Sequence, residues 1–238
     1  MPLPHDSWAD QYETVMALTF GDLYARLTSA ALDEIRGRIR PPASIVDFGA
    51  GCGRLSIPLA AEGYLLTAVE PSPAMLGQLR TRTGDRDVNA VECTMQEYRS
   101  DRKHDLALCV FTVVAYLLDE RALRAALSAA AQSLRPGGLF LLDVPDASVF
   151  EGFDHDSGDI MRRVEIASAG ASLYQFNEET TLRTDDGPQT YRDSFPIRHW
   201  RKEEILGATE QAGFVTEADV TARFEDLGAE YLLLRLAR

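Results

Sequence analysis

Three glycines at alternate positions follow a short apolar run and are the first residues whose spacing points to chemistry. The stretch 44–54 reads S-I-V-D-F-G-A-G-C-G-R, and a helix pattern opens directly after it. A strand that passes through a glycine turn into a helix presents backbone N–H groups and the positive end of a helix dipole. Ligands of open α/β sheets bind at this carboxyl edge. We therefore expect a cofactor site around Gly49, Gly51 and Gly53.

A carboxylate is expected at the same edge. The next predicted strand, 65–70, ends in Glu70, which lies 21 residues after Gly49. In this position a carboxylate can accept hydrogen bonds from both hydroxyls of a ribose. The sixth position of the turn is Arg54, where a dinucleotide-binding turn has Gly or Ala for close helix packing. This argues against a nicotinamide dehydrogenase, as does the lack of a recognisable set of hydride-transfer residues.

The elements that must position these residues alternate along residues 44–144. We predict strands at 44–48, 65–70, 88–93, 105–111 and 139–144, with helices at 54–62, 73–82 and 119–133. Such alternation favours parallel strands joined by right-handed crossovers. Continuous apolar runs such as L-A-L-C-V-F at 106–111 are typical of strands buried on both faces. The R-P-G-G stretch at 135–138 is predicted to end the last of these helices in a turn.

The remaining segments divide a single domain, 1–238, into further parts. Residues 1–43 are predicted to form a helical cap, and 44–145 the cofactor-binding core. Residues 146–200 interrupt the alternation, and we predict a lid with antiparallel strands at 160–167, 172–182 and 189–198. A helix at 201–212 and strands at 215–223 and 229–238 then complete the core.

Composition excludes several classes of function. The 238 residues carry a net charge of −13, and residues 151–200 have ten Asp and Glu against five Arg and no Lys. Nucleic-acid grooves need clustered cations, so a nucleic-acid partner is not expected. No apolar run approaches the roughly 20 residues of a membrane span, and the first residues show no signal-peptide pattern. Three separated cysteines without a C-x-x-C pair indicate a cytoplasmic protein without structural zinc.

Three motifs in fixed order resemble those of one family. V-D-F-G-A-G-C-G, A-V-E-P-S-P-A-M-L and L-R-P-G-G-L-F-L-L-D-V together resemble the class I S-adenosylmethionine-dependent methyltransferases of the small-molecule type. The resemblance covers about residues 44–144. It implies a Rossmann-like, seven-stranded, mostly parallel sheet with an antiparallel C-terminal hairpin, and S-adenosyl-L-methionine as cofactor.

The resemblance also implies which residues hold that cofactor. The glycines line its methionine part, Glu70 binds the ribose, and residues after the third strand flank the adenine. An N-terminal Tyr covers the cofactor in many small-molecule relatives, although packing in the core is an equal alternative for it. Thr94 stands where many relatives have an acidic residue, so the contact to the adenine amino group is expected from the backbone or from the Thr94 hydroxyl. The implied set is Tyr12, Asp47, Gly49, Ala50, Gly51, Gly53, Glu70, Pro71, Thr94, Met95, Val110 and Phe111.

Methyl transfer needs an in-line approach more than special functional groups, and holding the reactants together can contribute on the order of 7–11 kcal/mol. The segment 110–116, V-F-T-V-V-A-Y, should face the transferred methyl. It lacks the Asn- or Asp-Pro-Pro-aromatic motif of nucleic-acid amino-methylases and the acidic ligand of catechol-type enzymes, so no magnesium site is expected. Candidates for a general base are Tyr116, His155 and His199. His104 is predicted at the wrong end of the sheet and His5 near the terminus.

Three hypotheses follow from these observations. The first is a metal-independent methyltransferase that acts on nitrogen or oxygen of a small molecule. The second keeps the cofactor but uses its charge for chemistry other than methyl transfer, as in some natural-product enzymes. The third is a binding module that retains the pocket without turnover. The acceptor and the oligomeric state stay open.

Overall fold

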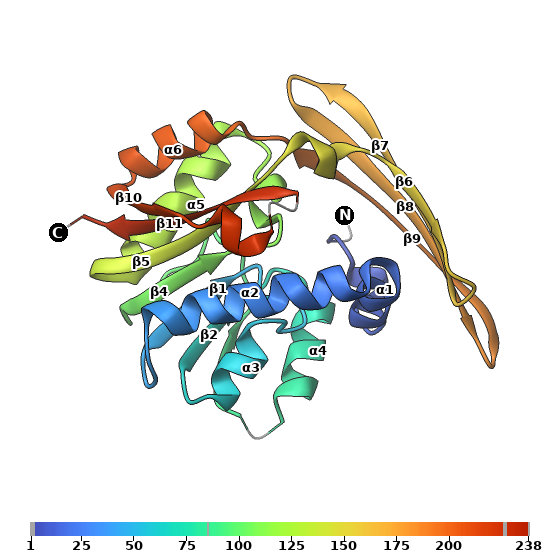
Figure 1. Ribbon diagram of the computed structural model, residues 1–238, viewed down its shortest axis with the longest axis horizontal. Helices are drawn as coiled ribbons and strands as arrows, with labels where there is room; N and C mark the ends of the chain where they lie inside the picture. Colours follow the sequence, from blue (N-terminus) through green and yellow to red (C-terminus); the bar gives the residue numbers. More distant parts are fainter. Residues whose placement is uncertain (1–2, 85, 226–227, 238) are drawn as a thin grey trace.

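The computed structural model describes residues 3–84, 86–225 and 228–237 and holds two β-sheets. The larger has seven strands in the order β10-β11-β5-β4-β1-β2-β3, and the smaller has four in the order β6-β7-β8-β9. Figure 1 shows the larger sheet between layers of helices and the smaller sheet projecting beside it as a curved blade. The larger sheet comprises β1 (Ser44–Phe48), β2 (Leu65–Val69), β3 (Val88–Val91), β4 (His104–Cys109), β5 (Leu134–Pro145), β10 (Phe214–Asp219) and β11 (Ala229–Leu236).

The first five strands of the larger sheet pair in parallel, and β10 and β11 add an antiparallel pair at the β5 edge. This confirms the predicted Rossmann-like fold class. The helices are α1 (Tyr12–Phe20), α2 (Asp22–Arg38), α3 (Ser56–Ala61), α4 (Pro73–Thr83), α5 (Glu120–Ser133) and α6 (Lys202–Gln211), and the 3-10 helices are η1 (Asp6–Trp8), η2 (Val113–Tyr116), η3 (Ala147–Phe150) and η4 (Thr221–Phe224).

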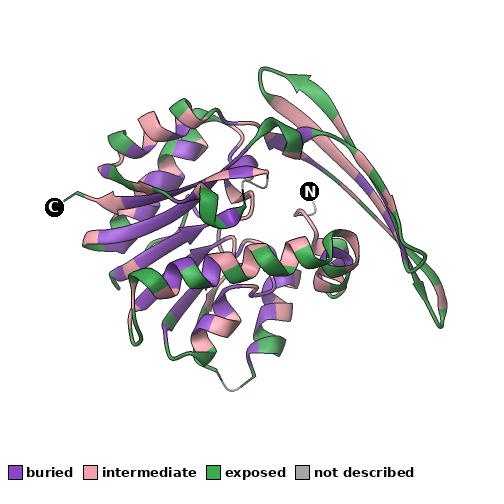
Figure 2. Ribbon diagram, viewed as in Figure 1, coloured by how far each residue is buried: buried purple, intermediate pink, exposed green. Residues whose placement is uncertain are grey.

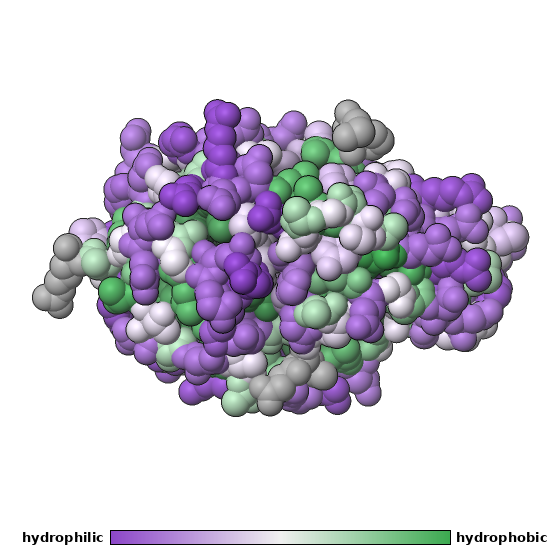
Figure 3. Space-filling view, turned by 90° about the horizontal axis from the view of Figure 1, so that it is seen from above, coloured by the Kyte–Doolittle hydropathy of each residue, from purple (hydrophilic) through white to green (hydrophobic). Residues whose placement is uncertain are grey.

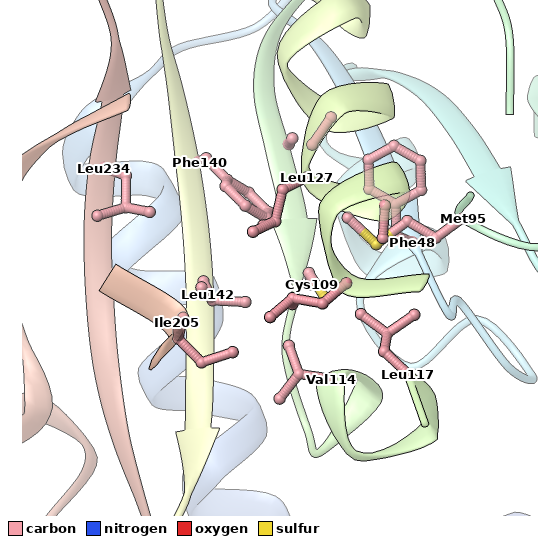
Figure 4. Close-up of a cluster of buried hydrophobic side chains, with 14 of the residues drawn as sticks. Phe48, Met95, Cys109, Val114, Leu117, Leu127, Phe140, Leu142, Ile205 and Leu234 are labelled. Atoms are coloured by element: carbon pink, nitrogen blue, oxygen red, sulfur yellow. The ribbon is translucent and has the colours of Figure 1, made fainter. Parts of the chain in front are cut away.

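The strands are apolar on both faces because helices cover both. On one face α5 and α6 contribute Leu127 and Ile205 to a cluster with Phe48 and Phe140 (Figure 4). On the other, α2 and α3 pack against alternate residues of the same strands, among them Ile45. Figure 2 shows the buried residues concentrated in this sheet. Every residue of β1 is buried, Ser44 and Asp47 included, as expected for a strand that is covered on both faces.

Side-chain caps fix the two helices that follow the turns next to the site. The Ser72 hydroxyl accepts a hydrogen bond from the Met75 amide at 3.0 Å at the start of α4, and Pro73 occupies the first turn. The Asp119 carboxylate accepts from the Ala122 amide at 2.7 Å at the start of α5. These caps satisfy amides that a helix leaves unpaired, and both helix starts agree with the predicted ones to within a residue.

The lid is the smaller sheet, β6 (Phe153–Asp156), β7 (Ile160–Gly170), β8 (Leu173–Thr184) and β9 (Gly187–Arg198). Ile160, Arg162 and Val164 of β7 are buried, while the residues between them are exposed. The three predicted lid strands correspond to β7, β8 and β9. The edge strand β6 was not predicted, because its sequence F-D-H-D is short and polar.

The strands predicted at 88–93, 105–111 and 229–238 each end two residues earlier in the structure. Two larger differences have identifiable reasons. The R-P-G-G stretch at 135–138 belongs to β5 as an irregularity where the register against β4 shifts. The strand predicted over 215–223 ends at Asp219, because its carboxylate accepts hydrogen bonds from the amide and hydroxyl of Thr221 at 3.0 and 2.6 Å. Such a local bond competes with a strand ladder, and η4 begins there. Within the described ranges, no helix is long and apolar enough to cross a bilayer.

Candidate active site

The glycine turn is tied to the neighbouring strand through its backbone. The amides of Gly49 and Ala50 donate to the Val69 carbonyl at 2.8 and 3.2 Å. Gly49 has φ +69°, and a Cβ atom there would lie 2.5 Å from the Val113 side chain. Only glycine fits both this backbone conformation and this close approach. A ligand at this turn would therefore contact backbone atoms rather than side chains.

Glu70 stands beside this turn and is buried, with an exposed fraction of 8%. Its Oε2 atom accepts a hydrogen bond from the Gly51 amide and its Oε1 atom from the Ser72 amide, each at 2.9 Å. Desolvation raises its pKa, and these two amides oppose the shift. A carboxylate has about four acceptor positions, so each oxygen keeps one for a further donor. The ribose contact of Glu70 stays a prediction, for which these two positions are available.

Asp47 lies behind the glycine turn and does not share the position of Glu70. It is buried, and its Oδ2 atom accepts a hydrogen bond from the Ser56 hydroxyl at 2.7 Å. Desolvation raises the pKa of Asp47 to about 7, opposed by the Ser56 hydrogen bond and assisted by the Glu70 charge. The Asp47 side chain thus links β1 to the start of α3 and holds together the two ends of the glycine turn.

Replacing Asp47 by Asn is expected to remove a pH dependence from stability. An unfolded Asp ionises near pH 3.9, whereas the folded pKa is about 7, so the folded state binds more protons between these values. The contribution of this carboxyl is full below about pH 4 and is lost as the pH rises to about 7, with a slope of at most about 1.4 kcal/mol per unit. Thermal unfolding from pH 4 to 8 measures it: the wild-type Tm should fall relative to that of D47N. Parallel curves would contradict the assignment.

The N-terminal segment 5–12 lies against both the turn and the lid. The Asp6 carboxylate accepts a hydrogen bond from the Ser72 hydroxyl, and the Cys52 thiol lies 3.5 Å from the Ala9 carbonyl. The rings of Tyr12 and Trp8 stack with centroids 5.4 Å apart. Desolvation raises the pKa of Tyr12 to about 12. Tyr12 also lines the large cavity next to this segment. Its predicted role in covering the cofactor stays a prediction.

The other predicted cofactor residues lie along the ends of β3 and β4. Thr94 donates its hydroxyl to Glu97 at 2.7 Å, and Met95 is buried in the core. Val110 is buried and directly follows β4, while Phe111 has φ +65° and turns the chain toward the acceptor side. The structure brings these elements to the same edge of the sheet, and Pro71 follows Glu70 there.

A cavity of about 510 Å³ opens beyond this edge, between the N-terminal helices, the ends of β4 and β5, and the lid. It is lined by ten Phe and Tyr side chains, by His5, and by four charged residues. Seen from above, apolar residues gather where core and lid meet, and the projecting end of the lid is hydrophilic (Figure 3). The aromatic lining is Tyr12, Phe20, Tyr24, Phe111, Tyr116, Phe150, Phe153, Phe176, Phe195 and Tyr231, and the charged residues are Arg54, Asp143, Glu151 and Arg162.

Arg54 is held in the cavity wall and does not fold back over the glycine turn. Its guanidinium carbon lies 3.8 Å from the ring centroid of Tyr24 and 3.6 Å from that of Phe111. It also donates to the Thr28 hydroxyl at 2.7 Å and to the Tyr24 carbonyl at 2.8 Å. Cation–π contacts on two faces and two hydrogen bonds fix the side chain.

The three predicted candidates for a general base lie in different places. Tyr116 lines the cavity, and its hydroxyl is 3.1 Å from the Nε2 atom of His5. Desolvation raises the Tyr116 pKa far above its usual value. His155 and His199 are not among the lining residues; the ring of His199 packs on Phe150 with centroids 4.9 Å apart.

Sequence reasoning missed two residues of the cavity. His5 was set aside because it lies near the N-terminus. The N-terminal segment folds back against the lid, where the backbone amide of His5 donates to the Asp193 carboxylate, and this brings His5 to the cavity. Burial lowers the pKa of His5 to about 3, with a smaller contribution from Arg162. Asp143 is 1% exposed, and only its position at the end of a predicted strand could have indicated it.

Comparisons with known proteins agree with this geometry. A family model described as a methyltransferase domain matches residues 45–138. A putative methyltransferase of Geobacillus is 28% identical over 94% of both chains. Two Streptomyces enzymes, each 29% identical, match over about half their length: cypemycin N-terminal methyltransferase (49% of this chain, 48% of that one) and dTDP-3-amino-3,4,6-trideoxy-α-D-glucopyranose N,N-dimethyltransferase of S. venezuelae (57% and 56%).

Solved structures with a similar fold also include methyltransferases. A crystal structure of an S-adenosylmethionine-dependent methyltransferase from Clostridium acetobutylicum superposes with a TM-score of 0.84 at 16% identity, over 96% of this chain and 99% of that one. Residues 45–138 thus match a methyltransferase domain, and the chain shares its fold with this S-adenosylmethionine-dependent methyltransferase. Both findings agree with the family that the motifs resemble.

Proposed function

We propose that the protein transfers a methyl group from S-adenosylmethionine to a nitrogen or oxygen atom of a small molecule in the cytoplasm. The observation that carries the proposal is one continuous edge of the sheet. On it, the glycine turn with the buried Glu70 beside it leads directly into Arg54, which lines a largely apolar cavity of about 510 Å³. That volume is within the range of small-molecule sites. The cypemycin and amino-sugar relatives are named as methyltransferases of an N-terminus and of a sugar nitrogen.

Each part of this edge has a role in the proposed reaction. When bound, S-adenosylmethionine supplies a methyl group on a positively charged sulfur. Glu70 and the backbone of the glycine turn hold and orient the cofactor, and Tyr12 with the N-terminal segment excludes water from it. The aromatic walls fix the acceptor, so that proximity contributes most of the rate. No role is assigned to a metal ion.

Calorimetry and a labelled cofactor test the proposal. S-adenosylhomocysteine should bind the purified protein at micromolar concentrations, and a methyl-labelled cofactor should label a small-molecule product when suitable acceptors are added. Labelling separates methyl transfer from chemistry that only uses the sulfonium charge. Absence of S-adenosylhomocysteine binding at millimolar concentration would overturn the proposal.

Tyr116→Phe is expected to lower kcat by roughly 10²-fold with a smaller effect on KM, because its hydroxyl helps to orient the acceptor. The reason is the position of that hydroxyl at the cavity, within hydrogen-bond distance of His5. Steady-state kinetics of Y116F measure the effect. His155→Ala and His199→Ala serve as controls, since neither residue lines the cavity. A larger loss of kcat in either control than in Y116F would reverse this assignment.

A further inference from the structure

Resting on the proposed function, we infer that the acceptor is an amine on an apolar, ring-bearing body without phosphate groups, and that Asp143 binds the amine. Three properties of the cavity carry this inference: an unpartnered buried acceptor atom, walls made mainly of aromatic rings, and cations that are already engaged.

The cavity is lined by one buried carboxylate with an oxygen atom that receives no hydrogen bond. Asp143 lines it with an exposed fraction of 1%. The Oδ2 atom accepts a hydrogen bond from the Thr112 amide at 2.8 Å, whereas the Oδ1 atom has no hydrogen-bond partner. A buried acceptor without a donor is unfavourable, so a ligand that brings an N–H donor gains a hydrogen bond at Asp143.

The walls match a cation with an apolar body. Tyr116 and Phe195 lie with ring centroids 5.8 Å apart, and Phe176 stacks on Phe195 at 4.8 Å. Aromatic faces attract ammonium groups, most strongly where water is excluded. The same rings offer flat contact area to a cyclic skeleton.

The cavity offers little to a phosphate. Of its two arginines, Arg54 is fixed between two rings as described above. Arg162 donates from Nε to Glu178 at 2.8 Å, and both side chains are buried. A diphosphate would need free cations with geometry for bidentate hydrogen bonds. The net charge of −5 over residues 151–200 further disfavours it.

Asp143 also suits the proton balance of the transfer. An ammonium must lose a proton before its nitrogen can attack, and the Asp143 carboxylate takes that proton. The nitrogen–carbon bond then forms as the sulfur–methyl bond breaks, so that the methylated amine carries the positive charge formerly on sulfur. Desolvation raises the pKa of Asp143 to about 7, opposed by backbone amides and Arg54. The group therefore accepts and releases a proton near neutral pH.

Calorimetry with matched probes tests the inference. Wild-type protein saturated with S-adenosylhomocysteine is titrated with 4-phenylbutylamine, with 4-phenylbutanol and with thymidine diphosphate. We expect the amine to bind at least tenfold more tightly than the alcohol, and thymidine diphosphate to bind more weakly than the amine. Asp143→Asn should remove the preference for the amine, while Asp154→Asn, an exposed lid residue, should keep it.

The outcomes separate this inference from the proposed function. Binding of S-adenosylhomocysteine together with equal affinities for amine and alcohol overturns the inference alone. Retention of the amine preference in D143N, or tighter binding of thymidine diphosphate than of the amine, also overturns it. The wild-type comparison decides even if D143N does not fold, because it needs no variant. Loss of S-adenosylhomocysteine binding by the wild type overturns the proposed function instead.

Discussion

Replacing Glu70 by Ala is expected to reduce S-adenosylmethionine affinity by about 10²- to 10⁴-fold. The carboxylate is proposed to accept hydrogen bonds from both ribose hydroxyls. Hydrogen bonds to a charged group contribute roughly 1.5–3 kcal/mol each, and each 1.4 kcal/mol is about tenfold in affinity. The change also frees the Gly51 and Ser72 amides, which the carboxylate now binds at 2.9 Å. Calorimetric titration with S-adenosylhomocysteine measures the loss.

Two further variants make this result specific. Glu70→Gln keeps the size of the side chain but loses the charge, so it should retain part of the affinity. Glu210→Ala removes an exposed carboxylate from α6, far along the chain from the glycine turn, and should bind as the wild type does. Wild-type affinity in E70A would show that the ribose is held elsewhere.

The buried ion pair of the lid should give the largest loss of stability. The Arg162 and Glu178 side chains are 3% and 1% exposed, and their nearest charged atoms are 2.8 Å apart. Removing one partner of such a pair leaves an uncompensated buried charge and costs about 3–5 kcal/mol. Glu178→Gln should therefore lower the free energy of unfolding by about that amount. Chemical denaturation measures it.

The same sheet provides a matched control. Arg192 and Glu179 face each other in the β8–β9 register and lie 2.6 Å apart, but they are 72% and 44% exposed. Exposed pairs contribute about 0–1 kcal/mol, so Glu179→Gln should change little. The double variant R162M/E178M should regain most of the lost stability, because no charge is left unpaired. Equal losses in E178Q and E179Q would contradict this account.

The parts of the molecule that could be predicted are those set by local pattern. The glycine turn and Glu70 follow from spacing, and the central strands follow from apolar runs that only two covered faces explain. The lid strands β7 to β9 were predictable because alternation and turn residues bound them. Apart from the 21-residue spacing of Gly49 and Glu70, the information in each case lies within about ten consecutive residues.

The parts that could not be predicted depend on contacts between distant segments. His5 reaches the cavity because its backbone binds Asp193, 188 residues away. The end of β10 is decided by a competing hydrogen bond of one Asp side chain, which a strand pattern does not reveal. Asp143 was seen only as a strand end, because the lack of a partner for its Oδ1 atom is a property of the packed cavity.

The contact of segment 5–12 with both Ser72 and Asp193 has a practical consequence for producing the enzyme. Figure 1 shows this segment between the core and the lid, so a purification tag fused ahead of it would lie close to both. A tag fused after β11 would emerge at the opposite side of the molecule. Carboxyl-terminal fusions therefore suit kinetic and crystallographic work on this protein.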